Sequence, residues 1–99
     1  MSIYSECSSS VIQILTEIAQ EDQELLSDVY HFEKFLESLE FPEGAEKCHS
    51  PRLFEDWFSI WSWFNFAIVQ KHAPSDLQCK YYSNMKLINA QIEEFYYTN

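Results

Sequence analysis

Two pairs of residues, Asp28 with His31 and Glu46 with His49, have an acid-x-x-His spacing that metal chemistry could use. In carboxylate di-metal bundles this spacing places both ligands on one face of a long helix, opposite a second such pair. Glu46 and His49 follow Pro42-Glu43-Gly44, which predicts a loop, because proline cannot continue a helix and glycine permits a left-handed turn. The two pairs are therefore not expected on facing helices, and we expect neither a metal site nor a cofactor.

Nucleophilic chemistry is equally unsupported by the sequence. Cys48 and His49 are adjacent, and neighbouring residues rarely face each other as nucleophile and base. Gly44 is the single glycine, so there is no glycine-rich loop to hold a phosphate group. We therefore expect that the protein is not an enzyme.

The cysteines and the N-terminus indicate the compartment. Cys7, Cys48 and Cys79 are odd in number and form no C-x-x-C pair, which fits free thiols in a reducing environment. The N-terminal residues lack the basic and apolar segments of a signal peptide. The longest apolar-rich stretch, residues 57–69, is too short to cross a membrane. We expect a cytoplasmic protein without a membrane partner.

Hydrophobic periodicity predicts an all-α fold, a four-helix up-and-down bundle in one domain. Ser10 and Gln13 have the spacing of a capping box, and Ser50-Pro51 is a strong helix start. The first two helices could be one long kinked helix, but we expect a break near residues 20–23. The expected segments are an N-terminal tail at 1–9, two helices within 10–41, a loop at 42–50, an aromatic helix at 51–72 and a C-terminal helix at 75–97.

Negative charge is concentrated in one part of the chain. The formal net charge is −10, and residues 17–46 hold ten acidic residues and one base, Lys34. An acidic surface of this kind favours a basic partner. Direct binding to nucleic acid is not expected, because phosphate contacts need clustered lysine and arginine. Helical spacing predicts two acidic rows, one if the first helix is continuous (Glu17, Glu21, Glu24, Asp28) and a second (Glu33, Glu37, Glu40).

The predicted third helix is apolar on nearly all sides. Between Trp57 and Val69, only Ser59, Ser62 and Asn65 are polar. Such a helix must be central in the bundle, or part of its aromatic surface must meet another chain. We expect one or two tryptophans to remain at the surface, and a homodimer through this helix stays open.

Parts of the first half resemble the immunity proteins of DNase colicins. The run from Val11 to Ile18 is similar to the first helix of that family, and Pro42-Glu43-Gly44 resembles the Pro-Asp-Gly after its second helix. The chain departs from the family at Cys48-His49-Ser50-Pro51, where paired tyrosines would precede the proline, and in its long aromatic helix. The resemblance implies that acids of the second helix contact a toxin: Glu24, Asp28, Glu33 and Glu37.

These observations predict an acidic inhibitor that covers the nucleic-acid groove of a basic protein, such as a nuclease toxin or a DNA-processing complex. A mimic of DNA directed against host defence machinery uses the same charge. A helical adaptor that assembles through its aromatic helix is the alternative of a different class. Charge steers the encounter and aromatic side chains anchor it. The candidate partner-binding residues are Glu17, Glu21, Glu24, Asp28, Tyr30, Glu33, Glu37, Glu40 and Trp57.

Overall fold

The computed structural model describes residues 3–40 and 51–95, which form helices joined by short turns and no strand within these ranges. The helices are α1 (Ile3–Ala19), α2 (Gln23–Ser38), α3 (Pro51–Trp63), the π-helix η1 (Phe64–Val69), α4 (Gln70–His72) and α5 (Ser75–Phe95). Because α3, η1 and α4 follow one another without a gap, they form one continuous rod, which we call the third rod.

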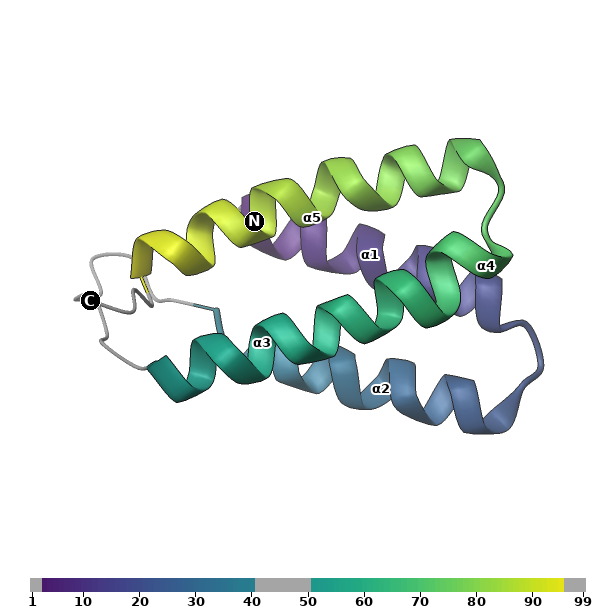
Figure 1. Ribbon diagram of the computed structural model, residues 1–99, viewed down its shortest axis with the longest axis horizontal. Helices are drawn as coiled ribbons and strands as arrows, with labels where there is room; N and C mark the ends of the chain where they lie inside the picture. Colours follow the sequence, from purple (N-terminus) through teal and green to yellow (C-terminus); the bar gives the residue numbers. More distant parts are fainter. Residues whose placement is uncertain (1–2, 41–50, 96–99) are drawn as a thin grey trace.

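Four rods run alternately up and down, as Figure 1 shows, with α1 beside α5 and α2 beside the third rod. The expected all-α bundle is thus confirmed, and its first two helices are separate. α1 packs against α2, η1 and α5, and the third rod contacts α1 through η1 and contacts α2 and α5 through its buried aromatic side chains. The core is built from the buried stripe of each rod, including Val11, Leu15, Leu36, Val69 and Ile88.

α1 begins at Ile3, seven residues before the predicted start at Ser10. The predicted N-terminal tail at 1–9 is therefore wrong for residues 3–9, and Ser10 lies inside the helix. Tyr4 and Cys7 are buried and continue the stripe of Val11 at helical spacing. Their burial stabilises two further turns, which a capping signal at Ser10 could not reveal.

The break between α1 and α2 has two local causes. Gln20 has a φ of 54°, a left-handed conformation that cannot continue a right-handed helix. Asp22 then caps α2, because its carboxylate accepts a hydrogen bond from the backbone N–H of Leu25 at 3.2 Å. The predicted break is confirmed, although the sequence analysis did not identify Asp22 as the capping residue.

The π-helical segment changes which side chains of the third rod face the core. Gln70 donates its backbone N–H to the carbonyl of Asn65, five residues earlier. In a regular α-helix, residues five apart point about 140° away from each other. The wider turn brings Val69 under Phe64, and both are buried. Asn65, expected on a polar strip with Ser59 and Ser62, is also buried.

Trp57 is a core residue and not a partner contact, which corrects the prediction for this side chain. It is 1% exposed, and its Nε1–H donates to Asn89 Oδ1 on α5 at 2.7 Å. Its ring stacks on Phe32 of α2 at 6.1 Å between centroids, and Phe32 stacks in turn on Phe64 at 4.7 Å. The indole therefore joins α2, α3 and α5. The tryptophan that does remain at the surface is Trp63, 47% exposed.

We predict that Trp57→Ala lowers the free energy of unfolding by about 3–5 kcal/mol, since it removes a large buried ring and leaves a cavity. Trp63→Ala, the matched control, should cost about 1 kcal/mol or less because nearly half of its surface is already in water. Urea unfolding followed by circular dichroism measures both. Equal losses of stability in the two variants would contradict the assignment of Trp57 as the residue that joins α2, α3 and α5.

Tyr81 is wholly buried, and its hydroxyl has no hydrogen-bond partner among the residues that the structure describes. Burial, with a smaller effect of Tyr82, raises the pKa of Tyr81 far above its usual value of about 10. Between these two pKa values the unfolded chain loses a proton that the folded chain keeps, so stability falls as pH rises above about 10.

We predict that Tyr81→Phe reduces this alkaline loss of stability and costs little at neutral pH, because it removes an unpaired polar atom and keeps the ring. Unfolding in urea at neutral pH and above pH 10 tests it. If the free energy of unfolding of the variant falls above pH 10 as steeply as that of the unmodified protein, Tyr81 does not contribute to the alkaline loss of stability.

Candidate functional site

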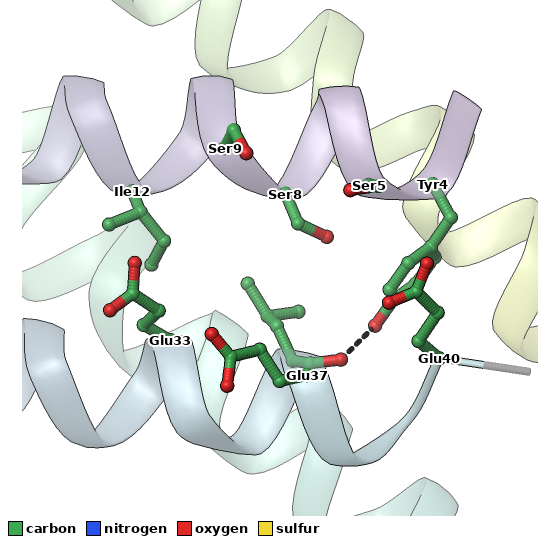
Figure 2. A pocket seen from close by; sticks show the side chains of 9 residues that line it. Tyr4, Ser5, Ser8, Ser9, Ile12, Glu33, Glu37 and Glu40 are labelled. Atoms are coloured by element: carbon green, nitrogen blue, oxygen red, sulfur yellow. Dashed lines mark hydrogen bonds between the residues drawn. The ribbon is translucent and has the colours of Figure 1, made fainter. Parts of the chain in front are cut away.

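A small acidic hollow lies between the first half of α1 and the second half of α2, and we call it the acidic groove. Its volume is about 100 Å³. Figure 2 shows the carboxylates of Glu33, Glu37 and Glu40 rising from the α2 side toward α1. Helical spacing places the three on one flank of α2, beside the buried stripe that contains Leu36. The groove is also lined by Tyr4, Ser5, Ser8, Ser9, Ile12 and Leu36.

The α1 side of the groove is held in place by Tyr4. This buried side chain donates its hydroxyl hydrogen bond to the backbone carbonyl of Leu36 at 2.7 Å, across the two helices. The serines beside it are short and leave the space into which the glutamates project. Ser8 Oγ is buried, points toward α2 and has no hydrogen-bond partner within 3–40 and 51–95. The arrangement can accept hydrogen bonds and positive charge, and the described residues that line it include no lysine or arginine.

An exposed aromatic residue lies on α2 next to this groove. Tyr30, one turn before Glu33, is 55% exposed. Lys34 Nζ lies 5.3 Å from the centre of the Tyr30 ring and 3.4 Å from a carboxylate oxygen of Glu37. The hydrogen bond to Glu37 raises the pKa of Lys34, so this base stays charged. Because both partners of the ion pair are exposed, the pair contributes little to stability and can exchange for a partner's cation.

The structure brings together only the second predicted acidic row, and the first is not a row. Glu17 lies in a hollow between α1 and α5, where Lys80 is also present. Glu21 lies in the turn, since the helix is not continuous there. Glu24 is exposed in the first turn of α2, and Asp28 lines a different groove, against α3. These four acids lie at separate places on the molecule and do not form one surface with Glu33 and Glu37.

The α1 half of the acidic groove was missed in the sequence, because residues 1–9 were expected to be a tail. The signal that could have found it is the spacing of Tyr4, Cys7 and Val11, which extends the apolar stripe and turns the intervening serines toward α2.

Within residues 3–40 and 51–95, no group of three or more histidine, cysteine, aspartate or glutamate side chains could hold a metal ion. Glu46, Cys48 and His49 lie outside the described residues. Across the described helices, none is long and apolar enough to span a membrane.

A second hollow, the aromatic groove, lies between α2 and the third rod. It has a volume of about 430 Å³, larger than the acidic groove, and is mostly apolar. Its walls are the rings of Phe32 and Phe64, with Trp63 at its edge. The remaining lining residues are Asp28, His31, Phe35, Ser59 and Ile60.

Comparison of the chain with protein-family models, curated proteins and solved structures gave no match. The resemblance to DNase-colicin immunity proteins therefore stays a prediction.

We predict that Glu33→Gln raises the free energy of unfolding at low salt by about 0.2–0.5 kcal/mol, because Glu33 and Glu37 are like charges four residues apart. Glu94→Gln, on α5, makes the same change of net charge without a like charge three or four residues away. Urea unfolding at low and high salt compares them. If Glu94→Gln raises the free energy of unfolding as much as Glu33→Gln does, the effect is due to net charge alone.

Proposed function

We propose that the protein is an inhibitor that binds a basic protein, a nuclease toxin, through the acidic groove and the neighbouring surface of α2. The observation that carries the proposal is the convergence of Glu33, Glu37 and Glu40 on one flank of α2, facing the hydroxyl-lined side of α1. Like charges at this spacing cost the free helix stability, and a cation of the partner would offset that cost.

Charge in this region favours fast and selective encounter with a basic surface. α2 carries four acidic residues and Lys34 as its single base. Opposite potentials increase the association rate by orders of magnitude at low salt and discriminate against acidic partners. The nucleic-acid groove of a nuclease is such a surface, and carboxylates placed where phosphates would lie can block it.

Tyr30 takes the anchoring role that the sequence analysis gave jointly to Tyr30 and Trp57. Its ring is exposed, lies beside the acidic groove and is held near Lys34. Tyrosine is enriched among the residues that dominate binding energy, because the ring is desolvated while the hydroxyl keeps a polar partner. A cytoplasmic location is part of this proposal and is supported by the free, exposed thiol of Cys79.

The experiment uses the product of the adjacent gene as the probe, with nuclease activity on DNA as the readout. We predict that Glu33→Lys with Glu37→Lys weakens binding at low salt at least about 100-fold, since two favourable charges become repulsive. Glu93→Lys with Glu94→Lys on α5 is the matched control, and it should weaken binding about threefold or less. Calorimetry measures both affinities, and circular dichroism confirms folding.

Three outcomes would contradict the proposal. These are a partner without nuclease activity and without net positive charge, an equal loss of affinity in both double variants, or affinity that does not fall as salt increases. Tyr30→Ala should lower the affinity at high as well as low salt, because its contribution is not electrostatic.

The adaptor alternative is favoured by a separate observation, the exposed rings of the third rod. Phe58 and Phe66 are 56% and 59% exposed, on a different rod from the acidic groove. Binding through these rings would resist salt and would be unaffected by the charge reversals on α2.

A further inference from the structure

The outward side of the third rod is an uncharged aromatic face in a strongly acidic protein. Phe58, Ser59, Trp63 and Phe66 are exposed on it, and Ser62 is half-buried among them. The fourteen residues from Trp57 to Gln70 include no charged side chain, although the chain carries a net charge of −10. A contiguous apolar face of this size on a small soluble protein marks an interaction surface.

On the third rod, charges appear only at the two ends of this face, and their signs are opposite; from α2, Asp28 lines the aromatic groove beside it. Glu55 and Asp56 are exposed at the α3 end, with Arg52 one turn earlier, so this end is net negative. Lys71 and His72 are exposed at the α4 end. Glu55 precedes Trp63 by eight residues, and Lys71 follows it by eight. The pattern is therefore complementary to itself when one rod is reversed.

We propose that this face pairs with the same face of a second copy of the chain, with the two third rods antiparallel around a twofold axis near Trp63. Glu55 of each copy then lies opposite Lys71 of the other, and the helix dipoles also run in opposite directions. A parallel pairing would instead set Glu55 against Glu55. An isologous pairing through an uncharged centre lets two molecules of like net charge approach with the least repulsion.

The shapes of the two faces also match in this register. Reversal around Trp63 brings Phe66 of one copy opposite Ile60 of the other, three residues from Trp63 on either side. Ile60 lines the aromatic groove, next to Phe35 and Phe64. The protruding ring of Phe66 thus meets a hollow of about 430 Å³ whose walls are aromatic.

The area available predicts a modest affinity. An aromatic side chain buries about 150–250 Å², so the exposed parts of Phe58, Trp63 and Phe66 remove about 300 Å² per copy. A standard interface buries about 800 Å² per partner. The serines and the groove walls bury part of the remaining area. The dimer should therefore have a dissociation constant in the micromolar range rather than be permanent.

Sedimentation equilibrium of the full chain from about 1 μM to about 1 mM tests the pairing, a range chosen for a small interface. The average mass should rise from monomer to dimer. Phe66→Glu should weaken dimerisation at least about 30-fold, because it places two carboxylates near the axis in an apolar contact. Phe58→Glu should do the same by the same mechanism. Leu87→Glu, at an exposed apolar residue of α5, is the matched control and should dimerise like the unmodified protein.

A charge-swap experiment tests the antiparallel register. Glu55→Lys and Lys71→Glu should each weaken the dimer, and the double variant E55K/K71E should return to within about threefold of the original affinity, since the pairs are restored with opposite signs. A double variant as weak as the sum of the single ones would overturn this register.

Two further results would overturn the proposal itself. One is a monomer over the whole concentration range. The other is an unchanged dimer in Phe66→Glu. If the protein is monomeric while Phe66→Glu abolishes binding of a different protein, the face belongs to that protein and self-pairing is refuted. The variant E33K/E37K should dimerise like the unmodified protein, and Phe66→Glu should still bind the basic partner. Failure of the self-pairing is therefore distinguishable from failure of the proposed function.

Discussion

The buried contact of Trp57 with Phe32 and Asn89 is the constraint on which the arrangement of the other rods depends. It connects α3 to α2 by ring stacking and to α5 by a hydrogen bond, so the rotation of the third rod is fixed. With Trp57 and Phe64 turned inward, Trp63 and Phe66 must face outward. An aromatic helix in a four-rod bundle can bury only one side, and the surplus rings become surface.

The same constraint positions the charges of α2. Burial of Phe32 and Leu36 fixes the helix so that Glu33 and Glu37 flank α1, whereas Asp28 flanks the third rod. One amphipathic helix thereby supplies an acidic groove on one flank and the rim of an aromatic groove on the other. The two grooves lie on opposite flanks of α2, so the proposed basic partner and the proposed second copy of the chain would occupy separate surfaces.

Much of the fold could be predicted because apolar spacing and proline signals are local. Pro51 and Ser75 do begin helices, and the turn near Gln20 does separate the first two. The π-helical segment could not be predicted, since it arises from Val69 packing in the core rather than from any local signal. Trp57 and Trp63 are alike in sequence, and only the rotation of the rod decides which is buried. The acidic row of Glu33, Glu37 and Glu40 was predictable because it lies on α2 and on the two residues that directly follow this helix. The row from Glu17 to Asp28 was not, because it crosses a break.

The central claim is that the acidic flank of α2 is where a basic partner binds. The most direct measurement is a two-dimensional NMR titration of the isotope-labelled protein with the basic product of the adjacent gene at low salt. We predict that the largest amide shifts fall on Tyr30, Glu33 and Glu37 and on the serines of α1 that line the acidic groove, and that reaching them takes more partner as salt increases. Shifts confined to Phe58, Trp63 and Phe66, and unchanged by salt, would contradict the account and assign binding to the aromatic face.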